Sequence, residues 1–235
     1  MKIIIIHKKI LFLMIACFAF VTSLHFIGKD ILSVFYQKEY EPIRHGDTSV
    51  NKIAFTCNVD WGNEVIPQML DILDQENVKI TFFITGRWAA NNSDMLKLIY
   101  ENGHEIGNHG YSHKLHSKIS KEQNIAEISK TEAAIKKVTG FKTRLFAPPA
   151  GDFNQTTLEA ADILGYQTIL WSIDTIDWRQ DSTASVIIER VMKKPHAGGI
   201  LLMHPKPETL KALPTIIHQL KEKNIHIGTV TDLLE

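Results

Sequence analysis

The chain has 235 residues, of which 44% are hydrophobic and 22% charged, enough for one sizeable core. This composition excludes disordered, collagen-like and disulfide-scaffold proteins. Lys and Arg number 26, as do Asp and Glu, so the net charge gives no electrostatic case for a nucleic-acid partner. The two cysteines, Cys17 and Cys57, lie in an apolar N-terminal run and in an expected strand, and we expect no disulfide between them.

The N-terminal segment predicts export. Ile10 to Gly28 carry no formally charged side chain and would span about 28 Å as a helix, close to the hydrocarbon thickness of a bilayer. Lysines before this run place the N-terminus in the cytoplasm and the remainder of the chain outside. We favour a single-pass membrane anchor over a cleaved signal peptide and secretion, because Val21-Thr22-Ser23 is only a weak cleavage site. Residues 29–51 follow as a stalk or as an extension packed on the domain.

From Lys52 to the C-terminus, short apolar runs alternate with helical patterns, as expected for one α/β domain over residues 52–235. Strands are expected at residues 53–56, 79–84, 104–106, 144–146, 167–171, 199–203 and 225–228, with helices between them and a loop over 172–181. Repeated βα units imply a parallel sheet with right-handed crossovers. About seven of them suggest a closed or nearly closed barrel.

Unusual polar residues follow these strands, and the carboxyl ends of parallel strands share one face of the fold. Any one of them could be structural, but their convergence from several independent loops favours a functional site. They are Asn58 and Asp60 after the first strand, His109 and His113 after the third, Pro148 and Pro149 after the fourth, Asp174, Asp177 and Trp178 after the fifth, and His204 after the sixth.

His109 and His113 lie four residues apart in a stretch rich in Gly, Asn and Ser. On a helical turn, or on a loop entering a helix, such a pair shares a face and can bind one divalent ion. A third ligand must come from elsewhere in the chain. Two solvated loop histidines are the alternative interpretation of this spacing.

Five motifs occur in order along the chain: TCNVD (56–60), HGYSH (109–113), FAPPAG (146–151), DTIDW (174–178) and LMH (202–204). Their order and spacing resemble those of the polysaccharide deacetylases, the NodB homology domain of carbohydrate esterase family 4. This resemblance implies a distorted (β/α)7 barrel, preceded here by the N-terminal transmembrane helix.

The resemblance also implies a role for each motif residue. The metal ligands would be Asp60, His109 and His113, holding Zn²⁺, or alternatively Co²⁺ or Mn²⁺. Such an ion polarises the N-acetyl carbonyl and lowers the pKa of a bound water. The general acid would be His204, with Asp174 or Asp177 as its partner. The substrate-binding residues would be Trp178, Leu202, Pro148 and Pro149.

Two motifs, the first and the third, depart from the family pattern. Asn58 stands where the family has the aspartate that acts as general base, and Ala147 stands where an arginine orients that base, while Ala150 replaces the usual tyrosine. An amide cannot take a proton from water, so another base would be needed, either Glu64 or the metal-bound water itself.

The main hypothesis is metal-dependent deacetylation of an N-acetylated cell-wall polysaccharide, either peptidoglycan or a chitin-like glycan. One rival is hydrolysis of another amide or ester, and the other is a catalytically weakened or inactive domain that binds acetylated glycan. No obligate protein partner is evident from the sequence.

Overall fold

The computed structural model describes residues 18, 22 and 40–235. The chain divides into two units, residues 1–39 and 40–235, and the second contains the fold considered below. The expected membrane segment, Ile10 to Gly28, lies outside the described residues except for Phe18 and Thr22. Within the described part of the chain, no helix has the length and apolar character needed to cross a bilayer.

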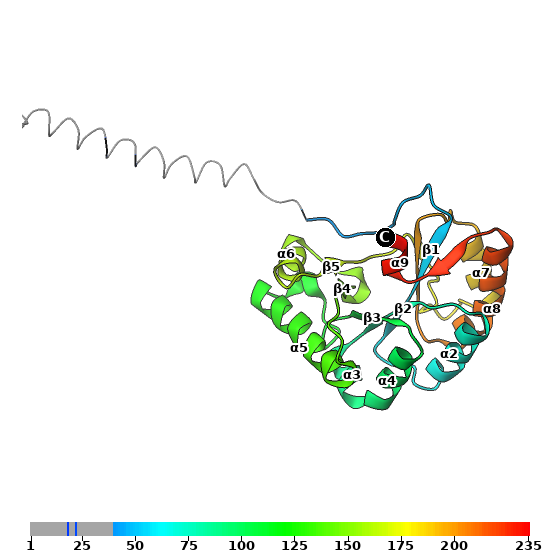
Figure 1. Ribbon diagram of the computed structural model, residues 1–235, viewed down its shortest axis with the longest axis horizontal. Helices are drawn as coiled ribbons and strands as arrows, with labels where there is room; N and C mark the ends of the chain where they lie inside the picture. The colour runs from blue at the N-terminus through cyan, green and yellow to red at the C-terminus, as the bar shows by residue number, and fades with distance from the viewer. Residues whose placement is uncertain (1–17, 19–21, 23–39) are drawn as a thin grey trace, which may run out of the picture. The chain divides into compact units, whose positions relative to one another are not determined.

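An eight-stranded sheet forms the centre of the second unit (Figure 1). All of its strand pairs are parallel, and the order is β5-β4-β3-β2-β1-β7-β6, with β8 beside the first residues of β1. The strands are β1 (Lys52–Val59), β2 (Thr81–Ile84), β3 (Glu105–Asn108), β4 (Leu145–Phe146), β5 (Gln167–Thr168), β6 (Ile173–Asp174), β7 (Gly199–Met203) and β8 (His226–Gly228).

Helices follow most of the strands and cover the sheet on the outside (Figure 1). Side chains from α2, α4, α7 and α8 pack with outward-facing strand residues in the largest hydrophobic cluster. The helices are α2 (Ile66–Gln75), α3 (Gly86–Asn91), α4 (Ser93–Glu101), α5 (Lys121–Thr139), α6 (Gln155–Ile163), α7 (Ala184–Met192), α8 (Pro207–Glu222) and α9 (Val230–Leu234), with short 3₁₀ turns η1 (His116–Lys118) and η2 (Pro149–Gly151). The alternating βα order expected from the sequence is confirmed.

The period of two along each strand decides which side chains face the inside of the sheet. In β1, Phe55 and Cys57 pack outward in the helix-covered cluster, whereas Ala54 packs in the inner one. Asn58 therefore shares the inner face with Ala54. In β7, Leu201 packs outward and Ile200 packs inward. The inward-facing side chains nearest the carboxyl ends of the strands therefore lie at the candidate site.

The sheet does not close into a complete barrel, because β5 and β6 are not paired with each other. Residues from the expected 29–51 extension cover the gap. The amide of Ile43 donates to Thr168 O at 2.8 Å, and Leu170 N donates to Ile43 O at 2.7 Å. Gly46 N then bonds to Gly198 O, near the start of β7. These bonds satisfy backbone groups that an open edge would leave unpaired.

Three elements were not expected from the sequence, namely α3, α9 and the short strand β6 inside the expected 172–181 loop. Helix α3 begins at Gly86, directly after β2, where the sequence suggests only the end of a strand. A Cβ at Gly86 would lie 2.3 Å from Tyr111 Cδ2, so this position has no room for a side chain. The close approach joins the start of α3 to the loop that carries both motif histidines.

Candidate active site

A cavity of about 390 Å³ opens at the carboxyl ends of the strands. Each of the five motifs contributes to it, so the convergence predicted from the sequence is observed. Trp171, which the sequence placed only at the end of an expected strand, also lines the cavity. The lining residues are Asn58, His109, His113, Ala150, Trp171, Asp174, Trp178, Leu202 and His204. Asp60, Asp177, Pro148, Pro149 and Glu64 are not among them.

His204 is held by a buried carboxylate. Its Nδ1 lies 2.7 Å from Asp177 Oδ1, and its backbone N–H donates to Asp177 Oδ2 at 2.7 Å. Thr209 Oγ1 also donates to Oδ2, at 2.6 Å. Burial raises the pKa of Asp177, but the hydrogen bonds from His204 and Thr209 outweigh it and bring the pKa below its usual value. Asp177 thus stays anionic, fixes the Nδ1–H tautomer and leaves the other ring nitrogen of His204 free for proton transfer.

Asp174 has a different role in this geometry. Its Oδ1 accepts the backbone N–H of Ile176 at 2.7 Å, and Ile176 has φ = 51°. A β-branched residue in the left-handed region is strained, so the carboxylate stabilises a tight turn between the two motif aspartates. Burial raises the pKa of Asp174 above its usual value. Of the two partners that the resemblance left open, only Asp177 contacts His204.

His109 is fully buried and oriented by the third motif. Its Nδ1 donates to the carbonyl oxygen of Ala147 at 2.6 Å, so Nε2 carries the free lone pair. Burial, with a smaller effect from His113, lowers the pKa of His109 to about 3, and the ring is neutral at ordinary pH. The His113 ring lies edge-on at 5.2 Å between centroids. A neutral imidazole with an oriented Nδ1–H has the character of a metal ligand.

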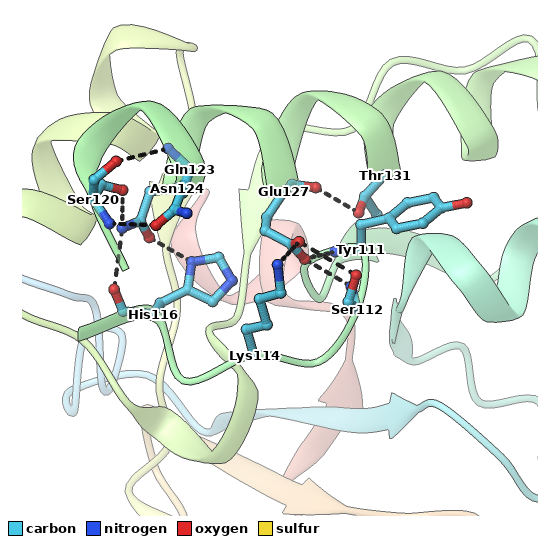
Figure 2. A network of polar contacts seen from close by, with 9 residues as sticks. All are labelled: Tyr111, Ser112, Lys114, His116, Ser120, Gln123, Asn124, Glu127 and Thr131. Atoms are coloured by element: carbon cyan, nitrogen blue, oxygen red, sulfur yellow. Dashed lines mark hydrogen bonds and ion pairs between the residues drawn. The ribbon is translucent and has the colours of Figure 1, made fainter. Parts of the chain in front are cut away.

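The histidine loop is not helical, and its shape is set by helix α5 (Figure 2). Glu127 Oε2 accepts the backbone N–H groups of Tyr111 and Ser112 at 2.9 and 2.7 Å, and Lys114 lies 3.3 Å from Oε1. Burial raises the pKa of Glu127, but its bonds to Ser112, Lys114 and Tyr111 outweigh this and bring the pKa below its usual value. The carboxylate therefore stays charged and holds the segment between the two histidines.

The start of α5 fixes the far end of the same loop (Figure 2). Asn124 Oδ1 lies 2.5 Å from His116 Nδ1, and Asn124 Nδ2 donates to His116 O at 3.1 Å. Ser120 and Gln123 form a capping box at the N-terminus of α5. The spacing of His109 and His113 is thus produced by a loop clamped to a capped helix rather than by one helical turn.

Asp60, the third expected metal ligand, is paired with Arg87. Arg87 Nε donates to Oδ1 at 2.8 Å, its Nη2 donates to Oδ2, and Thr85 Oγ1 donates to Oδ1 at 2.6 Å. Burial raises the pKa of Asp60, but the bonds from Arg87 and Thr85 outweigh it and bring the pKa below its usual value. Within the described residues, no group of three or more His, Cys, Asp or Glu side chains is arranged to hold a metal ion. Of the three expected ligands, Asp60 is thus the one engaged by an arginine.

The base position contains a buried amide. Asn58 is 6% exposed, and its Oδ1 is buried without a hydrogen-bond partner. Ala147, where the family has an arginine, is itself buried, so no cation reaches Asn58 from that position. Glu64, the substitute base suggested by the sequence, is solvent-exposed and lies outside the cavity lining.

Two tryptophans frame the site. Trp178 lines the cavity and is 60% exposed. Trp61 is 41% exposed and stacks on the His204 ring at 6.2 Å between centroids, with Lys206 Nζ 4.8 Å from its centroid. Exposed rings beside a cavity can stack on the apolar face of a flat ligand. Pro149, by contrast, is buried and lies outside the lining.

Sequence reasoning missed Arg87, Trp171, Glu127 and Thr209. A signal existed for Arg87, because it follows the second strand at the same end of the sheet as the other polar clusters. Trp171 continues an expected strand into the site. The other two act from helices α5 and α8, and a polar side chain on a helix gives no sequence signal for the loop that it contacts.

The fold and the site together define a parallel α/β domain of the NodB type. Its hydrolase-like site lies at the carboxyl ends of the strands. The polysaccharide deacetylase family profile matches residues 45–169, and the chain belongs to this family. The resemblance drawn from the five motifs is confirmed.

Among its relatives, the chain is 41% identical to the uncharacterised protein YlxY of Bacillus subtilis, over 83% of this chain and 61% of that protein. The chain thus spans less than two thirds of that relative's length. It is 33% identical to a peptidoglycan-N-acetylglucosamine deacetylase of Bacillus cereus, over 78% of this chain and 68% of that protein.

Among solved structures, the chain is similar to BA3943, described as a carbohydrate esterase family 4 pseudoenzyme from Bacillus anthracis. The TM-score is 0.82 at 40% identity, covering 84% of this chain and 70% of that chain. A mutant of that pseudoenzyme is described as having restored enzymatic activity. Relatives of this chain therefore include both peptidoglycan deacetylases and a pseudoenzyme.

Proposed function

We propose that this domain recognises N-acetylated cell-wall glycan in the cavity beside His204 and that its deacetylase chemistry is weak or absent. The observation that carries this proposal is Asn58, a buried amide where the family has its general base. An amide can orient a water molecule but cannot accept its proton, so the first step of hydrolysis lacks assistance.

The cavity supports recognition of an acetyl group. Leu202, Ala150 and Trp171 give it an apolar lining into which a methyl group can be buried. Trp178 offers an exposed ring at the edge of the same cavity, suited to stacking on a sugar face. Peptidoglycan is the favoured glycan, because several relatives are named as peptidoglycan deacetylases.

A second function, slow metal-dependent deacetylation, is favoured by the His204–Asp177 pair. Protonated His204 would donate a proton to the departing amine, and anionic Asp177 would stabilise the imidazolium. Asp60, His109 and His113 would hold a divalent ion, with Zn²⁺ favoured over Co²⁺ or Mn²⁺. Such an ion would supply Lewis-acid polarisation of the acetyl carbonyl and a more acidic water.

We further propose that the domain acts outside the cytoplasmic membrane, attached through residues 10–28 or released after cleavage of that segment. A cell-wall glycan is accessible on that side of the membrane. The charge pattern around the apolar run supports this orientation.

The test compares binding and hydrolysis by one purified sample of the full chain. Binding to N-acetylglucosamine oligomers and to muropeptides is measured by calorimetry, and acetate release is measured with and without a chelator. We expect binding with little acetate release. Trp178→Ala should weaken binding, whereas Phe141→Ala, which removes another exposed aromatic ring outside the cavity, should not.

Rapid acetate release that a chelator abolishes would refute the proposal of a binding domain with weak chemistry. It would support metal-dependent deacetylation instead. Absence of both binding and release on acetylated glycans would refute both proposals. Full binding by Trp178→Ala would remove this residue from the glycan site while leaving the rest of the cavity to be tested.

A further inference from the structure

We propose that Arg87 is a built-in competitor of the metal ion: its guanidinium occupies the carboxylate of Asp60 and keeps the divalent-ion affinity of the site low. This inference concerns metal binding alone. It stands whether or not the domain hydrolyses glycan.

The contact between the two side chains satisfies both carboxylate oxygens. Arg87 Nε donates to Oδ1 at 2.8 Å and Nη2 donates to Oδ2, which is the two-pronged geometry of strong arginine–carboxylate pairs. Thr85 adds a third donor to Oδ1 at 2.6 Å. Oδ1 thus accepts two bonds and Oδ2 one, which leaves a metal ion one lone-pair site on Oδ2. The ion must also approach a carboxylate whose charge the guanidinium already neutralises.

The fold places Arg87 where it meets this carboxylate. Its backbone N–H donates to Tyr111 O at 3.0 Å, and Gly86 N donates to Gly110 O at 3.0 Å. The first turn of α3 is therefore tied to the loop that carries His109 and His113, and Gly86 has no space for a side chain that would separate the two. An arginine at position 87 is thus held beside the histidine pair by backbone contacts.

The pair can open, because its two members differ in exposure. The Arg87 side chain is 51% exposed, whereas that of Asp60 is 12% exposed. Arg87 can swing into water without leaving a buried charge of its own. The carboxylate, in contrast, needs a cation in its partly buried position. An ion that displaces Arg87 would provide one, so arginine and metal are alternatives on one ligand.

The experiment measures Zn²⁺ affinity by competition with a chromophoric chelator, using the full chain. Removal of the competitor in Arg87→Ala should tighten binding by at least tenfold. Arg87→Lys keeps the charge but loses the planar fork, and its affinity should lie between those of the wild type and Arg87→Ala. The absorption spectrum of the Co²⁺-loaded protein gives a second readout that is independent of enzymatic activity.

Two controls define the site. Arg179→Ala removes an arginine of nearly the same exposure, 50%, that forms a similar two-pronged pair with Asp181, and should leave Zn²⁺ affinity unchanged. Adding Asp60→Ala to Arg87→Ala should abolish the gain, because the released ligand is then absent. Thermal unfolding of each variant shows whether the fold is retained, and Arg87→Gln provides a replacement of similar length if Arg87→Ala unfolds.

Unchanged Zn²⁺ affinity in folded Arg87→Ala or Arg87→Gln would overturn the proposal. Weaker binding in these variants would also overturn it, since Arg87 would then support Asp60 as a ligand instead of competing for it. A gain that persists without Asp60 would show that the ion binds elsewhere.

Discussion

Restoring the missing base should raise activity, and should raise it most in combination with its orienting cation. In Asn58→Asp, a carboxylate replaces a buried amide whose Oδ1 has no hydrogen-bond partner. Burial alone raises the pKa of such a carboxylate and reduces the fraction ionised at neutral pH. The single substitution should therefore recover part of the activity and lower the stability of the fold.

The size of the effect follows from the step being restored. A positioned general base contributes about 10²–10⁴-fold, which corresponds to about 3–5 kcal/mol of the barrier. Ala147→Arg alone should be inactive and destabilised, because position 147 is buried and the new guanidinium has no carboxylate partner. In the double variant each charge satisfies the other, so acetate release should rise more than additively.

The assay is a double-mutant cycle of acetate release from N-acetylglucosamine oligomers at saturating Zn²⁺, with thermal unfolding followed in parallel. Coupling should occur in both readouts, rate and stability. A wild-type protein that deacetylates rapidly, and that Asn58→Asp leaves unchanged or slows, would refute the reasoning, because some other group would already act as the base.

Three further predictions follow from the described contacts. His104 and His109 are buried and neutral with pKa values lowered by desolvation to about 4 and about 3, so unfolding takes up close to two protons near pH 5.5. Because the unfolded state binds more protons, stability should fall as pH decreases from about 6.5 toward 4, by about 2.5 kcal/mol per pH unit near pH 5.5, as measured by urea unfolding with chelator present. A flat stability profile across this window would contradict the burial of both rings. Glu127→Gln should lower the free energy of unfolding by about 1–3 kcal/mol and weaken Zn²⁺ binding, since it removes the charge that holds the histidine loop. The control Glu101→Gln, at an exposed ion pair on a helix, should change the free energy of unfolding by no more than about 0.5 kcal/mol. Protease treatment of intact, wall-stripped cells should degrade the domain if residues 10–28 anchor it outside the membrane, and survival until lysis would show that the topology is wrong.

The order of strands and helices could be predicted from the sequence because each buried strand is a short apolar run between amphipathic helices. The polar site followed from one rule, that parallel strands end on the same face. Neither argument needed a long-range contact.

The remaining features depend on contacts between residues distant in sequence. The gap between β5 and β6 is covered by Ile43, a residue in a segment without any periodic pattern. The choice between Asp174 and Asp177 depends on a turn in which Ile176 adopts a positive φ, and the sequence gives no sign of it. The pairing of Asp60 with Arg87 joins two strand ends that only the parallel register of β1 and β2 brings together.

The two unusual features of the site, Asn58 and the Arg87–Asp60 pair, affect metal binding in the same direction. A carboxylate within a few ångströms of a divalent ion attracts it by roughly 4 kcal/mol per unit charge at an effective dielectric of 20. The amide of Asn58 lacks this attraction, and in the same site Arg87 competes with the ion for Asp60. Asn58→Asp should consequently tighten Zn²⁺ binding as well as supply a base. Affinity and rate separate the two effects: the rate at saturating Zn²⁺ reports the base alone, whereas the affinity reports the charge. Combining Asn58→Asp with Arg87→Ala should then raise affinity beyond either single change, without a matching increase in the saturated rate over Asn58→Asp.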